Sequence, residues 1–324
     1  MEPRSRAVPR NRLRAAVTDF AAEACRIAAA VLAREVTGAR RFTTGLQHFV
    51  YEVSLSDGTA VVMRMTQPEH RSLARNALRL SSTLRPLGVP LPEVIAADVD
   101  AAHPWMMLER LAGTDLGAVV SELGDAQLRS IAAGVAAAQH AVARTETRGR
   151  YGYAPSAETA PFASWAEVVA AHIERSRLRI AAAGLFDLSL VEALQVQLDA
   201  RRAELDDVVA TPFLHDTTTK NVIVADGRLS GIVDVDDLCF GDPRYVAALT
   251  RVALTSHGVS PAYSEYLMEA AGWPEDGLFR LYVAAFLLDF MSEHGQRFNG
   301  NESPSSAEAR DGLRTRFDTV MRSL

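Results

Sequence analysis

The chain has 324 residues, of which 48% are hydrophobic, and its formal net charge is −6 at pH 7. This length and apolar content suffice for one large domain or two lobes with a sizeable core. The acidic balance argues against a general nucleic-acid-binding protein, and the lack of a run of ~18 apolar residues argues against a membrane-spanning helix.

The first third of the chain is predicted to contain one helix followed by a β-rich region. Residues 12–35 are rich in alanine and place apolar side chains at helical spacing, which predicts a helix. Residues 38–110 predict the order β-β-β-α-β-β, with three strands before residue 66, a helix from Pro68 to Leu87, and strands at 94–97 and 105–109. Gly88 is expected to end this helix.

The remainder of the chain reads as mostly helical, with a few short strands. Helices are predicted at 125–145, 164–183, 189–208 and from 243 onward, strands at 213–214, 222–224 and 229–233, and a loop at 151–163. The pattern predicts an α+β fold with a helical extension (1–37), a small β-rich N-terminal lobe (38–110) and a larger helical C-terminal lobe (111–324).

Oxygen-bearing side chains gather around two of the predicted short strands. Asn221 follows Asp216 by five residues, and Asp234 stands 18 residues after Asp216, at the end of an apolar strand. Carboxylate and amide oxygens are ligands that Mg²⁺ prefers beside nucleotide phosphates. A separate carboxylate can orient a substrate hydroxyl group and accept its proton, so the pattern indicates phosphoryl transfer.

Several motifs resemble those of the aminoglycoside phosphotransferase and choline kinase-like family. They are LHDTTTKN (214–221), IVDVDD (232–237) and GDP (241–243), supported by GVPLPEV (88–94) and MLERLAGTDL (107–116). The resemblance covers about residues 38 to 297 and implies a two-lobed protein-kinase-like fold. It also implies a small-molecule kinase that uses Mg²⁺ and transfers the γ-phosphate of ATP or GTP to a hydroxyl group of a small, amine-bearing substrate such as an aminoglycoside.

The resemblance also implies roles for individual residues. Asp216 matches the catalytic aspartate, and Asn221 and Asp234 match the metal ligands. Nucleotide-binding positions are Gly45, Arg64, Glu109, Arg110 and Leu111, while Asp242 matches a structural aspartate. Three departures from the family pattern stand out: Arg64 replaces a lysine, Asn76 replaces its glutamate partner, and Leu214-His215 replaces His-Gly.

Lys220 is the only lysine of the chain and lies between the expected base and a metal ligand. A compact ammonium group at this position can reach a transferring phosphate, although a solvent-exposed lysine is the alternative.

Four further acids are candidates for substrate binding. Asp236 and Asp237 can meet a metal or a substrate ammonium group, or else cap a helix or face solvent. Asp289 and Glu293 share one face of a helix; by resemblance they line a cationic substrate pocket, and the alternative is a solvated surface.

Two other functions stay open at this stage. One is a non-catalytic kinase-fold protein that binds a nucleotide or metabolite, and the other is a metal-dependent hydrolase using the acids at 234–237. Cys25 and Cys239 lie far apart without CxxC spacing, which argues against a zinc site or a disulfide framework. We expect a cytoplasmic monomer or homodimer whose partners are a nucleotide and a hydroxyl-bearing small molecule, with no nucleic acid and no membrane.

Overall fold

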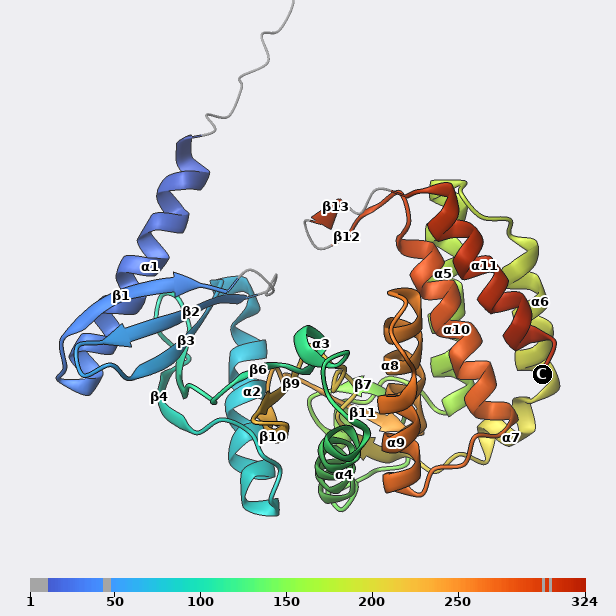
Figure 1. The fold of residues 1–324 in the computed structure, drawn as a ribbon, viewed down its shortest axis with the longest axis horizontal. Coiled ribbons are helices and arrows are strands. Elements are labelled where there is room, and N and C mark those ends of the chain that lie inside the picture. Colours follow the sequence, from blue (N-terminus) through green and yellow to red (C-terminus); the bar gives the residue numbers. More distant parts are fainter. Residues whose placement is uncertain (1–10, 43–47, 299–300, 303–304) are drawn as a thin grey trace, which may run out of the picture. The chain divides into compact units, whose positions relative to one another are not determined.

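The computed structural model describes residues 11–42, 48–298, 301–302 and 305–324 (Figure 1). The chain forms two compact units. The first unit consists of Met1–Leu78 and Pro92–Arg110, and the second consists of Arg79–Leu91 and Leu111–Leu324. None of the described helices is both long enough and apolar enough to cross a membrane.

The first unit is an antiparallel five-stranded sheet with one long helix against it. Its strands β1 (Val36–Arg41), β2 (His48–Leu55), β3 (Ala60–Thr66), β4 (Val94–Asp98) and β5 (Trp105–Glu109) pair in the order β1-β2-β3-β5-β4. Helix α1 (Asn11–Leu32) places Phe20 and Ala24 in a core with Tyr51, Met63 and Met107 of the sheet. The order of five strands around one helix follows the prediction, and β2, β3 and β5 bury apolar residues as their patterns indicated. Strand β1 lies at Val36–Arg41, earlier than expected, and has no buried residue.

Helix α2 (Arg71–Leu84) is bounded by short 3₁₀ turns at Pro68–His70 and Arg85–Leu87. Gly88 ends the second 3₁₀ turn, and with it the helical segment, as the sequence predicted; its φ of 90° is a left-handed conformation that costs glycine little. The helix belongs to the first unit up to Leu78 and to the second unit from Arg79 onward.

The second unit is mainly helical. Its helices are α3 (Leu116–Val119), α4 (Asp125–Val142), α5 (Trp165–Ala183), α6 (Ser189–Ala200), α7 (Arg202–Asp206), α8 (Arg244–Ser256), α9 (Ala262–Ala271), α10 (Gly277–Glu293) and α11 (Ala307–Met321). Helix α10 buries most of its side chains and packs against α5, α6, α8 and α11, so it forms the centre of the core (Figure 1).

Short strands in the second unit hold the loops that carry polar residues. Strands β6 (Thr114–Asp115), β9 (Val222–Ala225) and β10 (Arg228–Ile232) form one sheet in the order β10-β9-β6. Strands β7 (Gly152–Ala154), β8 (Thr211–Phe213) and β11 (Leu238–Gly241) form another in the order β7-β11-β8. A small hairpin pairs β12 (Arg297–Phe298) with β13 (Asn301–Glu302).

Three sequence expectations for this unit were wrong. The predicted loop at 151–163 contains β7, and β11 was not predicted at all. Both are too short for a periodic pattern and become strands only by pairing within the sheet, β7 with β11 and β11 with both β7 and β8. The single helix expected at 189–208 is two helices separated at Arg201, whose backbone leaves the helical conformation.

Candidate active site

The loop that follows β8 carries Asp216, and a buried leucine anchors its start. Leu214 is 2% exposed and belongs to an apolar cluster with Leu84 of α2, Ala138 of α4 and Ile232 of β10. An apolar side chain is therefore well suited to this position. The structure thus accommodates Leu214, at the position where the sequence resemblance led us to expect a histidine, in an apolar cluster.

Gln139 of α4, which sequence reasoning missed, holds the same loop through a fully buried amide. Its Oε1 accepts a hydrogen bond from the Leu214 amide nitrogen (2.9 Å), and its Nε2 donates to the Leu214 carbonyl oxygen (3.0 Å) and to Thr217 Oγ1 (2.8 Å). Buried hydrogen bonds of this kind set a unique loop conformation because an unmatched partner would be costly. Gln139 thus fixes the two residues that flank the His215–Asp216 pair.

The β9–β10 hairpin brings Asn221 and Asp234 to the same end of a sheet. Val222 pairs with Ile232, and the Val233 amide donates to the Asn221 carbonyl oxygen (2.9 Å). Asp234 follows directly, with a φ of 63°. This left-handed conformation is uncommon outside glycine and is best tolerated by Asn and Asp, and such backbone outliers cluster at functional sites.

Asn221 also connects the hairpin to the loop that carries Asp216. Its Nδ2 donates to both the backbone carbonyl oxygen and the Oδ2 of Asp216, each at 2.9 Å. Since Nδ2 is committed to Asp216, the amide oxygen Oδ1 points to the other side of the group. The structure therefore brings together the loop carboxylate and the hairpin amide that sequence spacing had placed five residues apart.

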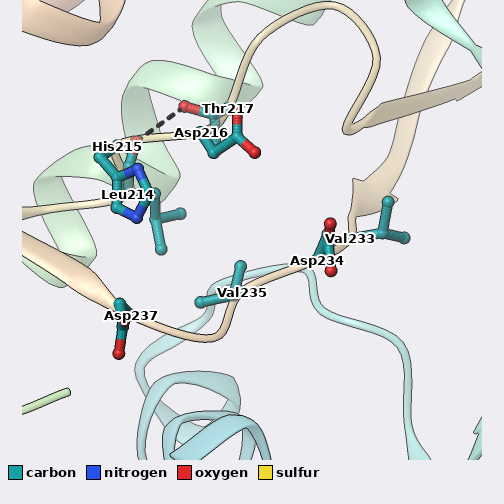
Figure 2. A pocket seen from close by; sticks show the side chains of 8 residues that line it. All are labelled: Leu214, His215, Asp216, Thr217, Val233, Asp234, Val235 and Asp237. Carbon is teal, nitrogen blue, oxygen red and sulfur yellow. Dashed lines mark hydrogen bonds between the residues drawn. The ribbon is translucent and has the colours of Figure 1, made fainter. Parts of the chain in front are cut away.

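Asp216 and Asp234 line a pocket of the second unit (Figure 2). Its lining consists of Leu214, His215, Asp216, Thr217, Val233, Asp234, Val235 and Asp237. In Figure 2 the Asp216 side chain lies between His215 on one side and Asp234 on the other. Asp216 is in contact with water. Partial burial by the surrounding protein and the charge of Asp234 raise the pKa of its carboxyl group to about 6. The Asn221 hydrogen bond and the charge of Lys220 act in the opposite direction.

His215 is a neutral side chain at neutral pH. Burial lowers its pKa to about 4, although the charge of Asp236 acts in the other direction. Its ring meets Tyr153 of β7 edge-on, with ring centroids 4.8 Å apart. His215 therefore lines the pocket as a neutral ring packed against an aromatic side chain and contributes no charge to it.

The remaining candidates on the loops have different surroundings. Lys220 is exposed and forms no hydrogen bond or ion pair with the part of the chain that the structure describes. Burial and the charge of Asp236 raise the pKa of Asp237, while Arg79 lowers it. Asp237 Oδ1 is buried and accepts no hydrogen bond from the described residues, which makes it a candidate for contact with a ligand.

Asp289 on α10 is held by basic side chains of α5. Its carboxylate lies 3.4 Å from His172 Nε2, 3.3 Å from Arg175 Nη2 and 3.5 Å from Arg179 Nη1. Burial alone would raise the pKa of Asp289, but His172 and Arg175 outweigh burial and lower it to about 2. The group is an ionised counter-ion for α5.

Glu293, one turn further along α10, has a raised pKa, whereas that of Asp289 is lowered. Burial and the neighbouring charge of Asp289 raise its pKa to about 7, despite the opposing charges of Arg179, Lys220 and Arg175. Asp289 and Glu293 do share a face of the helix, as predicted, but only Asp289 is fully ionised at neutral pH.

The raised pKa of Glu293 predicts that Glu293→Gln stabilises the protein at alkaline pH. A carboxyl group with a raised pKa in the folded state contributes stability below its unfolded pKa and loses it as pH rises through the folded value. Thermal unfolding should therefore show a higher Tm for the variant at about pH 8.5 and no difference at about pH 4.5. Equal melting temperatures at both pH values would show that ionised Glu293 carries no penalty.

The positions expected to bind nucleotide lie mostly in the first unit. Arg64 is 8% exposed on β3, where it pairs with Val50 and Met106 across the sheet. Arg110 Nε donates to Glu52 Oε2 at 2.7 Å, and Glu109 Oε2 accepts from the Glu93 amide at 3.1 Å. Leu111 begins the long segment of the second unit, and Gly45 lies outside the described residues.

Asp242 has the structural surroundings that the resemblance implied. It is buried, and its carboxylate accepts hydrogen bonds from the Arg244 side chain (2.6–3.0 Å) and from Tyr282 Oη (2.9 Å). Tyr282 in turn accepts from Trp165 Nε1 at 2.9 Å. These hydrogen bonds connect α8, α10 and α5 around the buried carboxylate of Asp242, which is paired with the guanidinium group of Arg244.

The donor set at the hairpin fits a magnesium ion that also binds phosphates. In the described residues, no three His, Cys, Asp or Glu side chains are grouped as metal ligands. Mg²⁺ does not need such a cage, because it is usually held by one or two carboxylates together with substrate phosphates and water. The Asp234 carboxylate and the Asn221 amide oxygen supply oxygen ligands of this kind.

Comparison with known proteins agrees with this architecture. The family model described as "Phosphotransferase enzyme family" matches residues 38–282, whereas no curated protein sequence matches the chain. The structure of aminoglycoside phosphotransferase APH(4)-Ia has a TM-score of 0.64 at 17% identity, covering 95% of this chain and 99% of that chain. Its thermostable mutant in a ternary complex with ADP and hygromycin B has a TM-score of 0.63 at 17% identity, covering 92% and 98%.

A candidate fructosamine-3-kinase from Thermobifida fusca is also similar, with a TM-score of 0.58 at 18% identity and coverage of 92% of this chain and 97% of that chain. Identities this low show a shared fold. They confirm the predicted α+β, protein-kinase-like fold, with a β-rich N-terminal part and a helical C-terminal part. The family match extends over most of the chain, and the chain therefore belongs to the phosphotransferase enzyme family.

Proposed function

We propose that this protein is a small-molecule kinase that transfers the γ-phosphate of ATP to a hydroxyl group of a small acceptor. The observation that carries the proposal is the pair of hydrogen bonds from Asn221 Nδ2 to Asp216, which joins a loop carboxylate to the metal-ligand end of the hairpin. ATP is favoured as the donor because related structures contain ADP or AMP-PNP.

Asp216 is the proposed catalytic base. Its carboxylate lies at the pocket surface and is accessible to an incoming hydroxyl group. It would orient that hydroxyl for in-line attack and accept its proton as the bond to phosphorus forms and the bond to the leaving ADP oxygen breaks. Gln139 keeps this carboxylate in place by fixing Leu214 and Thr217 on either side of it.

Asn221 and Asp234 are the proposed magnesium ligands. A bound magnesium ion neutralises phosphate charge, which is most of what phosphoryl transfer requires besides positioning. We further propose that Arg64, Glu109, Arg110 and Leu111 contribute to nucleotide binding. Lys220 is an additional cation in range of Asp216, whose pKa it lowers, and is proposed to contact the phosphate that moves.

The acceptor is proposed to be a hydroxyl-bearing molecule of the size of a sugar or amino sugar. APH(4)-Ia, which shares the fold, has been crystallised with ADP and hygromycin B. An amine-bearing acceptor such as an aminoglycoside would need carboxylates that are free to bind it. Asp237, whose buried Oδ1 accepts no hydrogen bond from the described residues, meets this requirement better than Asp289, which already has three basic neighbours. Asp236 is proposed as a second candidate for such a contact.

Thermal unfolding with and without Mg²⁺ and ATP tests the proposal. Ligand at ~100 times its dissociation constant stabilises a protein by about 2.7 kcal/mol, which raises the Tm of a protein of this size by roughly 5–10 °C. We expect such a rise with Mg²⁺ and ATP together and a much smaller one with ATP alone. No magnesium-dependent rise would contradict the nucleotide site, whereas a rise without phosphate transfer to any acceptor would favour a non-catalytic nucleotide-binding protein.

A further inference from the structure

His215 forms one wall of the pocket, and the proposed transfer step does not use it. It lines the pocket next to Asp216, it is half-buried, and burial lowers its pKa to about 4, so the imidazole is neutral. The backbone of His215 does not adopt a left-handed conformation, so a side chain is accepted here without strain. The motif that the chain resembles has glycine at this position. An imidazole ring therefore fills space that glycine would leave open.

The imidazole ring is held from two directions. Leu214, the residue before it, is 2% exposed, and the buried amide of Gln139 binds both its backbone nitrogen and its carbonyl oxygen. On the other side, the ring of Tyr153 meets the imidazole edge-on, with ring centroids 4.8 Å apart. Tyr153 is itself fixed on β7 by its pairing with Cys239 of β11. Moving the imidazole out of the pocket would therefore break its contact with Tyr153.

The other side chains that line the pocket are apolar, acidic or already hydrogen-bonded. The apolar ones are Leu214, Val233 and Val235, and the acidic ones are Asp216, Asp234 and Asp237. Thr217 is 1% exposed, and its hydroxyl group donates to the Leu214 carbonyl oxygen and accepts from Gln139. Among the described residues that line the pocket, none is a lysine or an arginine. The pocket can therefore select an acceptor by its shape and by negative charge, but not by positive charge.

The geometry of phosphoryl transfer directs the acceptor toward His215. The attacking and leaving oxygens lie on opposite sides of the phosphorus atom, and the leaving ADP is next to the magnesium ion that Asn221 and Asp234 are proposed to hold. In Figure 2 the Asp216 side chain lies between His215 on one side and Asp234 on the other. The carbon atom that bears the reacting hydroxyl group therefore points away from Asp234 and toward the imidazole.

We propose that His215 is a specificity-determining residue, which limits the acceptor to molecules that react through a primary hydroxyl group. The inference rests on the proposed function and specifies the chemical class of its second substrate. The carbon atom of a primary alcohol carries one carbon substituent, whereas that of a secondary alcohol carries two, and the second substituent would meet the imidazole ring. In a close-fitting pocket, one methylene group changes kcat/KM about 10- to 200-fold.

The test is a transfer assay with two pairs of isomeric alcohols. We would supply Mg²⁺ and ATP with 2-amino-1-propanol or 1-amino-2-propanol, and separately with 1-propanol or 2-propanol, at the high concentrations that weak acceptors require. The members of each pair have the same atoms and the same charge, and differ in whether the hydroxyl group is primary or secondary. Each transfer converts ATP and the alcohol into ADP, a phosphate monoester and a proton. The esters are quantified by ³¹P NMR and counted only where Asp216→Asn removes them, and the wild type should favour the primary member of each pair.

Replacement of His215 separates the preference of the protein from the reactivity of the alcohols, because primary alcohols are also the less hindered nucleophiles in solution. His215→Ala should lower the ratio of kcat/KM values, primary over secondary, at least about 10-fold in both pairs, because the secondary alcohol gains room. His215→Phe keeps a ring that can pack against Tyr153 and should keep the ratio.

His257→Ala is the matched control. It removes an exposed histidine at the end of α8 that does not line the pocket, so the ratio and kcat should equal those of the wild type. The magnesium-dependent rise in Tm with ATP should persist in all three variants, which shows that each one is folded.

The outcomes separate this inference from the proposed function. A wild-type preference for the secondary alcohols, or the same ratio in His215→Ala and His257→Ala, would overturn the role of His215 while phosphate transfer itself stands. Absence of Asp216-dependent ADP formation with every alcohol and with water would overturn the proposed function, and the inference with it.

Discussion

Asp216→Asn is expected to lower kcat by roughly 10²–10⁴-fold, the usual contribution of a positioned general base. The substituted amide cannot accept the hydroxyl proton, but it retains an oxygen that can accept the Asn221 hydrogen bond seen at 2.9 Å. The loop should therefore keep its conformation, and the magnesium-dependent rise in Tm with ATP should persist. Steady-state kinetics and thermal unfolding on the same preparation measure the two effects separately.

Asp226→Asn is a suitable control for this experiment. Asp226 lies in the turn between β9 and β10, is exposed, and has a φ of 51°. Asparagine accepts this left-handed conformation as readily as aspartate, so the control removes a carboxylate from the same hairpin without backbone strain. Wild-type turnover by Asp216→Asn would rule out the proposed base.

Asp234→Asn is expected to abolish most of the magnesium-dependent binding of ATP. Its side chain is one of two proposed ligands, and removing its charge weakens the attraction for a divalent cation next to phosphates. Loss of an outer-shell partner alone costs metal sites about 10- to 100-fold, so a direct ligand should cost at least about 100-fold in kcat/KM for ATP. The measurement is the ATP dependence of turnover at several magnesium concentrations.

The choice of asparagine matters here because the Asp234 backbone has a φ of 63°. Alanine in this conformation would add strain, so a defect of Asp234→Ala would mix folding with metal binding. The same substitution removes the negative charge that helps to raise the pKa of Asp216. Unchanged magnesium dependence in Asp234→Asn would assign the metal, if one binds, to other residues.

Several elements of the fold could be predicted because their signals are local. Strands β2, β3, β4 and β5, the helical segment that begins at Pro68, and the left-handed Gly88 that follows it all appear where the sequence placed them. Periodicity and turn chemistry act over a few residues and do not depend on partners. Strands β7 and β11 escaped prediction because they are defined by pairing with strands far away in the sequence: β7 with β11, and β11 also with β8.

The candidate site likewise contains residues that local sequence spacing could predict and one that it could not. Asp216, Asn221 and Asp234 lie close along the chain and are joined by a hairpin, so their spacing alone indicates a common site. Gln139 gave no such signal, because it stands 75 residues before the loop that it holds. A glutamine within an alanine-rich helix has no local feature that distinguishes it from a surface residue.

The sequence by itself determined the strand and helix order of the first unit, the family, and the positions of the residues proposed to bind metal and accept a proton. Only the tertiary structure decided what those residues face. It showed that Asp289 is already paired with the basic side chains of α5 while Glu293 is partly protonated at neutral pH, although both stand on the same face of α10. The reason is physical: secondary structure follows from neighbours along the chain, whereas the charge state of a carboxyl group depends on burial and on charges brought near by folding.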